Sequence, residues 1–135
     1  MTSLLIAMVA FGGPQYTWRA IEVAPAIWTQ AGAEDPYLLA AMAWVESRWS
    51  PRARSKTKDC GLLQTNIRWS KLTCAELMSA YVSVKTAVGS IRYWRGRFGK
   101  DWLCHYNSGN QCWRRSRAYA AKVLRTMGKL RRVVK

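Results

Sequence analysis

The chain has 135 residues, half of them hydrophobic and eight of them tryptophan, and its 22 Lys and Arg outnumber 7 Asp and Glu to give a formal net charge of +15. This length and apolar content indicate one folded domain and exclude a disordered basic tail. The charge favours an anionic partner, but it does not distinguish a nucleic acid, a membrane surface and a cell-wall polymer.

An apolar run begins the chain at residues 4–11 and is followed by Gly12, Gly13 and Pro14. It is too short to cross a bilayer, so we expect no transmembrane span. It suits the apolar region of a signal peptide, yet no Lys or Arg precedes it and no clear small-residue cleavage site follows it. Residues 1–24 are therefore either a secretion signal with a lead-in helix or a retained segment that packs on the domain, and the two alternatives have equal weight.

The remaining chain has helical periodicity, no alternating strand run and no internal repeat, which predicts a mainly α fold. Asp35 and Pro36 are typical of a helix start, and Thr73 with Glu76 forms a capping box. The expected helices span residues 16–30 with an interruption near Pro25, 37–48, 73–98 with a break near Ser83, 101–106 and 116–130.

Residues 50–72 show no helical pattern and are expected to form a long structured loop or a small hairpin. Long loops in compact domains usually carry function, which makes this segment a candidate part of a site. At the other end of the chain, basic residues gather from Lys122 onward, and we expect a solvated helix face that continues into a basic tail at residues 131–135.

Cys60, Cys74, Cys104 and Cys112 admit three disulfide pairings, and their spacings match none of the usual zinc-site patterns. We expect no metal site, and we expect His105, which follows Cys104, to be a packing residue. The pairing Cys60–Cys74 and Cys104–Cys112 is favoured because each bond closes a short loop. Disulfides indicate an oxidising compartment. Four reduced thiols in a cytosolic protein are the second alternative.

Glu46 is anomalous because it shares a helical stripe with apolar residues. Leu39, Met42 and Glu46 follow one another at spacings of three and four on the helix that begins after Asp35. A carboxylate on a buried face has a raised pKa, as a general acid working near neutral pH requires. The alternative, of equal weight on the stripe alone, is that Glu46 reaches solvent or pairs with Arg48 or Arg52.

Four motifs follow one another in the chain: AWVESRWSPRA at residues 43–53, GLLQTN at 61–66, HYNSG at 105–109, and RAYAAKVL at 117–124. In this order they resemble the lytic transglycosylase family over residues 25–130, most closely its small members that accompany secretion, conjugation and phage entry. The resemblance implies a lysozyme-like helical domain of the goose-type and lytic transglycosylase kind, acting on peptidoglycan without a cofactor.

Single positions of this chain match functional positions of the family. Glu46 matches the single catalytic acid and base, and Ser47 the hydroxyl that helps to orient it. The positions that match substrate-binding side chains are Ser47 itself, Gln64 with the following Asn66, the pair Tyr106 and Asn107, and Tyr119, a phenol near the catalytic carboxylate. The chain departs from the family pattern at Leu63, His105 and Ser108, which we expect to alter glycan subsite preference rather than the reaction.

The implied reaction cleaves the bond between N-acetylmuramic acid and N-acetylglucosamine and forms a 1,6-anhydro product. Exposed Trp49 and Trp69 are candidates for stacking on a sugar, and we expect that role for one of them at most. One alternative is a goose-type-like hydrolase with Asp59 as the second carboxylate. The other is a cationic module without enzymatic activity that binds wall, nucleic acid or membrane.

Peptidoglycan glycan strands are the expected partner, and no specific nucleic acid is expected, since the peptide carboxylates of the wall already suit a basic surface. The family setting adds envelope-machine or virion proteins as further partners. The expected wall substrate and the expected disulfides together predict a periplasmic or extracellular protein. Association with a virion is included in this prediction.

Overall fold

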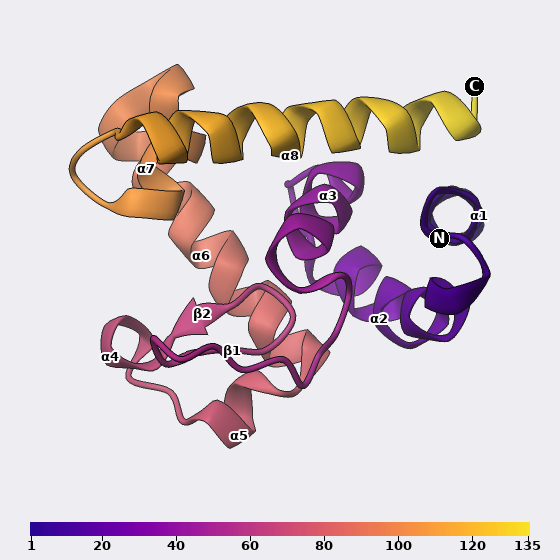
Figure 1. Cartoon of the computed structure of the whole chain (residues 1–135), viewed down its shortest axis with the longest axis horizontal. Coiled ribbons are helices and arrows are strands. Elements are labelled where there is room, and N and C mark those ends of the chain that lie inside the picture. The colour runs from indigo at the N-terminus through magenta and orange to yellow at the C-terminus, as the bar shows by residue number, and fades with distance from the viewer.

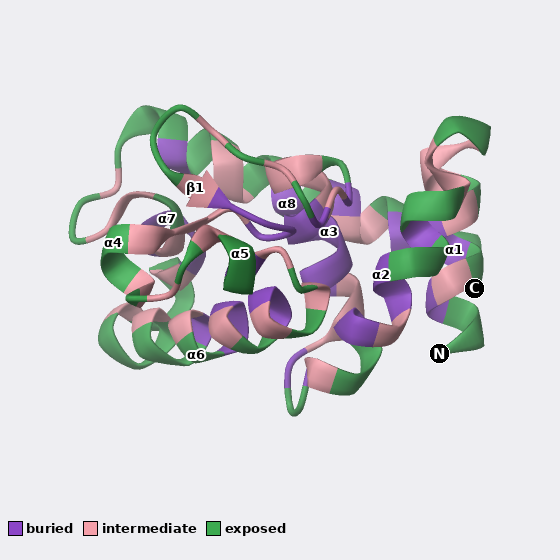
Figure 2. Ribbon diagram, turned by 90° about the horizontal axis from the view of Figure 1, so that it is seen from below, coloured by how far each residue is buried: buried purple, intermediate pink, exposed green.

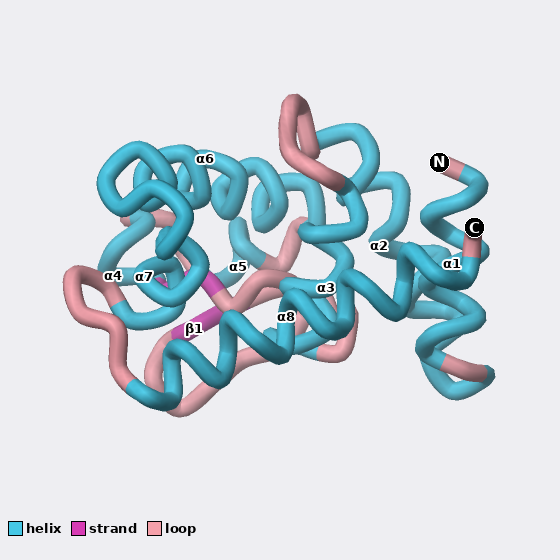
Figure 3. The backbone as a smooth tube through the Cα atoms, turned by 90° about the horizontal axis from the view of Figure 1, so that it is seen from above, coloured by secondary structure: helices cyan, strands magenta, loops and turns pink.

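The computed structural model describes residues 1–135, and helices dominate it (Figures 1 and 3). The elements in chain order are α1 (Thr2–Gly12), η1 (Pro14–Tyr16), α2 (Thr17–Gln30), α3 (Pro36–Ser47), β1 (Asp59–Cys60), β2 (Thr65–Asn66), α4 (Ile67–Ser70), α5 (Cys74–Leu77), α6 (Ala80–Phe98), η2 (Gly99–Asp101), α7 (Trp102–Ser108) and α8 (Arg114–Val133). This confirms the predicted mainly α fold class. No helix combines the length and the apolar character that crossing a membrane requires.

Helix α3 lies at the centre of the molecule, and six consecutive residues from Leu38 to Ala43 are buried (Figure 2). The Asp35 carboxylate caps the helix by accepting the backbone N–H of Tyr37 at 2.8 Å, and Pro36 occupies the first turn. Helix α8 packs along α3 and also contacts α1 and α7. The last turn of α3 is therefore held between the long C-terminal helix and the loops that follow it.

The segment after α3 contains a small hairpin, one of the two forms that the sequence predicts for it. Strands β1 and β2 pair antiparallel, with Asp59 opposite Asn66 and Cys60 opposite Thr65. A disulfide between Cys60 and Cys74 ties this hairpin to α5. In Figure 3 the loops gather around the hairpin, whereas helices make up most of the molecule.

The N-terminal apolar run forms helix α1, which packs against α2 and α8. Leu4 and Met8 are fully buried, and the Phe11 ring meets Trp44 of α3 edge to face at 5.2 Å between ring centroids. Figure 1 shows α1 beside the C-terminal end of α8.

Two predicted helix breaks and several predicted helix ends were wrong. Helix α2 runs through Pro25 without interruption, and α8 continues past Leu130 to Val133. Helix α6 has no break at Ser83, because the buried Ser83 hydroxyl accepts the backbone N–H of Leu63 at 3.0 Å and packs inside the domain. The break lies before α6, where the Ser79 side chain caps the helix by accepting the N–H of Val82.

Candidate active site

Glu46 is the next-to-last residue of α3, where the helix leaves the core, and its side chain is partly buried. The Tyr119 hydroxyl, from α8, donates a hydrogen bond to Glu46 Oε2 at 3.0 Å. The two residues are 73 positions apart in the chain, and the packing of α3 against α8 brings them together. The carboxylate therefore has one oxygen held by a neutral donor.

The surroundings of Glu46 favour its protonated form. Burial raises the pKa of Glu46 from 4.5 to about 7, and the negative charge of Asp59 contributes a smaller increase. The hydrogen bond from Tyr119 acts in the opposite direction, because it stabilises the charged carboxylate, but burial outweighs it. A group with this pKa is able to give and to take a proton at neutral pH.

Tyr106 and Tyr119 remain phenols in this environment. Burial raises the pKa of each hydroxyl well above its usual value, and the nearby Glu46 charge raises both further. Both side chains are consequently hydrogen-bond donors at any physiological pH.

Neither Arg48 nor Arg52, the two candidate ion-pair partners of Glu46, pairs with it. Arg52 forms a two-pronged pair with Glu22 of α2, at 2.9 and 3.1 Å. The Arg48 guanidinium lies over the Trp44 ring, 4.5 Å from its centroid. The ion pair with Arg48 or Arg52 that the sequence allowed for Glu46 is therefore wrong, whereas Glu46 does reach the solvent of a cleft.

Glu46 opens onto a cleft of about 890 Å³. The cleft lies between the hairpin region and the helices α6 and α7, and the start of α8 closes one end. Its lining is mostly polar: Glu46, Thr57, Asp59, Leu63, Gln64, Thr65, Asn66, Trp69, Thr86, Gly89, Ser90, Tyr93, Trp94, Tyr106, Asn107, Ser108, Gly109, Asn110 and Arg115. The polar lining suits a hydrophilic ligand better than an apolar one.

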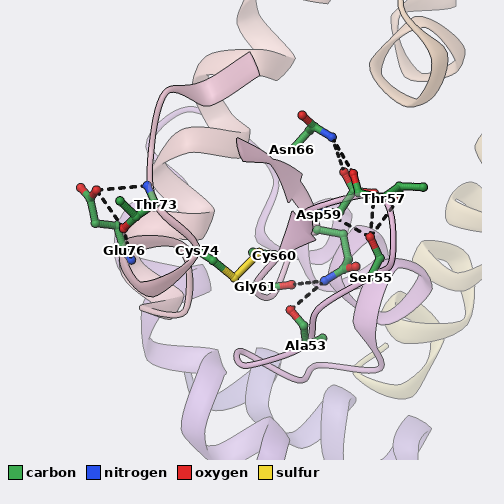
Figure 4. The surroundings of a disulfide bond; sticks show 11 residues. Ala53, Ser55, Thr57, Asp59, Cys60, Gly61, Asn66, Thr73, Cys74 and Glu76 are labelled. Carbon is green, nitrogen blue, oxygen red and sulfur yellow. Dashed lines mark hydrogen bonds between the residues drawn. A yellow bond between two sulfur atoms is a disulfide. The ribbon is translucent and has the colours of Figure 1, made fainter. Parts of the chain in front are cut away.

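Asp59, the second carboxylate of the cleft, is held by its own hairpin (Figure 4). Its Oδ2 accepts hydrogen bonds from the hydroxyls of Ser55 at 3.1 Å and Thr57 at 2.8 Å, and its Oδ1 accepts the Asn66 amide at 3.1 Å. Three donors thus occupy both oxygens and fix the side chain as part of the hairpin.

Gln64 and Asn66 both line the cleft and are anchored by their amide nitrogens. Gln64 Nε2 donates to the carbonyls of Ala53 at 3.1 Å and Gly61 at 3.0 Å, and Asn66 Nδ2 donates to the Thr57 carbonyl in addition to Asp59. Gln64 adopts a φ of +51°, unusual for a residue with a side chain. The hairpin therefore presents both amides in fixed positions.

Ser47 does not line the cleft. Its hydroxyl lies behind Glu46, donates to the Leu62 carbonyl at 2.7 Å and accepts the N–H of Ser50 at 3.1 Å. These bonds join the end of α3 to the hairpin loop. The position of Ser47 is that of a residue that holds Glu46 in place rather than one that touches a ligand.

Tyr106 and Asn107, on α7, form the opposite wall together with the loop that follows them. A disulfide between Cys104 and Cys112 closes this loop, so both predicted disulfides are present and no cysteine is free. His105 is buried against the Phe98 ring, with the two rings stacked at 3.4 Å between centroids, and its Nδ1 bonds the Gly109 carbonyl at 2.7 Å. His105 thus supports the wall from behind.

The two tryptophans expected at the site differ in their exposure to solvent. Trp49 is fully buried, and its indole N–H donates to the Ala40 carbonyl at 2.8 Å, so the prediction that it is exposed was wrong. Arg48 and Trp49 both adopt positive φ, and this turn directs the indole back into the core. Trp69 is 83% exposed and lines the cleft.

The geometry agrees with a comparison of the sequence with known families. The Transglycosylase SLT domain family matches residues 24–126, which include Glu46, the hairpin, α7 and Tyr119. The chain belongs to the SLT transglycosylase family. Membership implies activity of the lytic transglycosylase type on peptidoglycan, within a mainly α, lysozyme-like domain. No curated protein and no solved structure matches the chain significantly.

Sequence reasoning missed several residues of this SLT transglycosylase cleft. Thr86, Ser90, Tyr93 and Trp94 lie on α6, where the helical pattern marks only a solvated face. Asn110 and Arg115 follow the HYNSG motif directly, so their proximity to the motif was the available signal. No group of three or more His, Cys, Asp or Glu side chains is placed to hold a metal ion.

Proposed function

We propose that the protein cleaves the β-1,4 bond between N-acetylmuramic acid and N-acetylglucosamine in peptidoglycan, with Glu46 as the single acid and base. The observation that carries the proposal is a glutamate with a pKa of about 7, held by Tyr119 and facing a polar cleft. Protonated Glu46 gives its proton to the glycosidic oxygen as the bond from that oxygen to the anomeric carbon breaks.

The second half of the reaction returns the proton to Glu46. The substrate's own acetamido oxygen shields the positive anomeric carbon after the first bond breaks. The Glu46 carboxylate then takes the proton of the C6 hydroxyl, and the C6 oxygen bonds the anomeric carbon to give 1,6-anhydromuramic acid. No water is consumed, and Glu46 ends the cycle protonated as it began.

The other site residues have supporting roles in this proposal. Tyr119 positions Glu46 by donating a hydrogen bond to its carboxylate. Ser47 positions it by bonding the end of α3 to the Leu62 carbonyl. Gln64 and Asn66 contact the sugars from the hairpin, whereas Tyr106 and Asn107 contact them from α7. Trp69 is the aromatic side chain with enough exposed surface to stack on a sugar face.

The hydrolase alternative needs a carboxylate that holds a water on the far face of the sugar. Asp59 is the available candidate, but hydrogen bonds from Ser55, Thr57 and Asn66 already take up three of the roughly four acceptor positions of its carboxylate. The C6 hydroxyl needs no such positioning, because it belongs to the same sugar ring and has the effective concentration of an intramolecular group. This supports the anhydro product over hydrolysis.

A cationic binding module without activity is the other alternative. The charge of +15 supports it, but it leaves unexplained why a glutamate with a raised pKa faces the cleft. We further propose a location in the periplasm or outside the cell, including delivery by a virion or an envelope machine. The two disulfides support such an oxidising compartment.

Release of labelled fragments from purified peptidoglycan tests the assignment of Glu46. We expect Glu46→Gln to reduce release by at least about a thousandfold, as loss of an acid that serves both half-reactions implies. Asp59→Asn keeps the side-chain shape and is expected to retain most of the activity. Substantial release by Glu46→Gln, in a variant that circular dichroism shows to be folded, would contradict the proposal.

A further inference from the structure

Arg115 is the only cationic side chain in the lining of the cleft, although the chain has 22 Lys and Arg. It is the second residue of α8 and is exposed at the end of the cleft formed by α7 and the following loop. None of the other basic side chains lines the cleft. Apart from the two carboxylates Glu46 and Asp59, the rest of the lining is uncharged, so a single positive charge there is a specific feature rather than part of the general basic surface.

Arg115 has no partner within the protein. The three ion pairs of the chain use Arg52, Arg95 and Arg131. The two carboxylates of the cleft are engaged elsewhere, Glu46 with Tyr119 and Asp59 with the hairpin donors. The guanidinium therefore keeps its full set of donors for a ligand.

Stability does not account for an arginine at this position. The first turn of α8 contains arginines and no acidic residue. The positive end of the helix dipole disfavours cations in a first turn, where Asp or Glu would stabilise the helix. The sequence thus carries a small electrostatic cost at the place where α8 meets the cleft.

The wall that carries Arg115 is firmly held. The Cys104–Cys112 disulfide closes the loop three residues before Arg115, and Ser116 anchors the start of α8 by accepting the N–H of Trp113 at 2.9 Å. Asn107 and Asn110 line the same end of the cleft. The backbone that carries one cation and two amides is therefore held in place beside the cleft.

We propose that Arg115 binds a carboxylate of the peptide that muramic acid carries in peptidoglycan, and that it makes the enzyme prefer peptide-bearing strands over peptide-free glycan. This rests on the proposed function, since it assigns part of the same substrate. The planar guanidinium forms paired hydrogen bonds with a carboxylate. A strand that an amidase has freed of its peptides keeps only the lactyl carboxylate of each muramic acid, so it lacks the peptide carboxylates that Arg115 binds.

The test compares Arg115→Gln with Arg117→Gln, a control that removes an exposed cation from the same helical turn but lies outside the cleft lining. Each variant and the wild type are assayed on peptide-bearing glycan strands and on strands freed of peptides by an amidase. We expect Arg115→Gln to reduce kcat/KM on peptide-bearing strands about tenfold, through KM, and to leave cleavage of peptide-free strands unchanged. Arg115→Lys should recover part of the loss.

Two results would overturn the assignment of Arg115 while leaving the proposed function standing: an equal loss on both substrates, and no loss on peptide-bearing strands. A loss of the same size in Arg117→Gln would attribute the effect to general surface charge and would also overturn it. If the wild type cleaves neither substrate, the proposed function fails, and the role of Arg115 fails with it.

Discussion

The pKa of Glu46 links the candidate active site to the stability of the whole protein. The carboxyl titrates near 4.5 when the chain is unfolded and near 7 in the folded protein. Between these values the folded protein holds a proton that the unfolded chain releases. Stability that is present below pH 4.5 is therefore lost progressively as the pH rises to 7.

Glu46→Gln removes this dependence, because a glutamine stays neutral at every pH. We expect the variant to be more stable than the wild type at pH 8, by on the order of 1 to 3 kcal/mol, and to differ from it by less than about 1 kcal/mol at pH 5. Urea unfolding of both proteins at the two pH values measures the difference. A difference that is the same at pH 5 and pH 8 would show that burial of the Glu46 charge has no effect on stability.

Sequence reasoning at the residue scale worked where helical spacing was sufficient. The stripe of Leu39, Met42 and Glu46 correctly indicates a glutamate at the edge of the core. It could not choose between burial and an ion pair, because that depends on where Arg52 and Tyr119 lie in space. The burial of Trp49 depends on positive φ angles at Arg48 and Trp49. The sequence missed it because a glycine is the usual sign of a positive φ, and neither residue is a glycine.

At the scale of elements, the hairpin depends on the close approach of Gly61 to α5. A Cβ at Gly61 would lie 2.0 Å from the Leu77 carbonyl oxygen, and the residue adopts a φ of +84°. The Cys60–Cys74 disulfide holds the same two segments together and prevents them from separating. The geometry of Gln64 and Asn66 therefore depends on a glycine at this position.

We expect Gly61→Ala to destabilise the protein by about 3 kcal/mol or more, because backbone strain and a clash with main chain combine. Gly96→Ala is the matched control, since Gly96 lies within α6 and an added Cβ meets nothing within 4 Å. That control should be neutral or should stabilise the helix by up to about 1 kcal/mol. Thermal unfolding compares the two, and equal melting temperatures would contradict the close approach.

The packing of helix α1 can also be tested, because its apolar face is part of the core. We expect Leu4→Ala to cost about 2 to 4 kcal/mol, as a fully buried leucine requires. Ile6→Ala changes a side chain on the same helix that is 54% exposed and should cost less than about 0.5 kcal/mol. Chemical denaturation measures both, and a Leu4→Ala variant as stable as the wild type would mean that α1 does not pack on the domain.

Periodicity predicted the helices well but placed some of their breaks wrongly. Pro25 suggested an interruption, yet α2 continues through it, and a break was placed near Ser83, yet α6 continues through that residue as well. At Ser83, tertiary packing supplies what local propensity lacks, as the hydrogen bond from the Leu63 N–H to the Ser83 hydroxyl shows. The α6 wall of the cleft was beyond prediction, because it depends on how α6 faces the hairpin.

At the scale of the whole molecule, charge is divided between surface and cleft. Every charged residue of α8 is basic, and the helix runs along the length of the molecule (Figure 1). The cleft contains two carboxylates and one arginine. The exterior thus attracts an anionic polymer over a long range, while the cleft remains suited to proton transfer by Glu46. Composition predicted the basic exterior. The cleft around Glu46 could be found only from the fold.

The most direct test of the central claim is the chemical form of the products released from purified peptidoglycan in ¹⁸O-labelled water. If Glu46 alone serves as acid and base, mass spectrometry will find muropeptides that end in 1,6-anhydromuramic acid, lighter by one water than hydrolysis products, without a reducing end and without ¹⁸O. Products that end mainly in reducing muramic acid carrying ¹⁸O would contradict this account and would make Asp59 the candidate second catalytic carboxylate of a hydrolase.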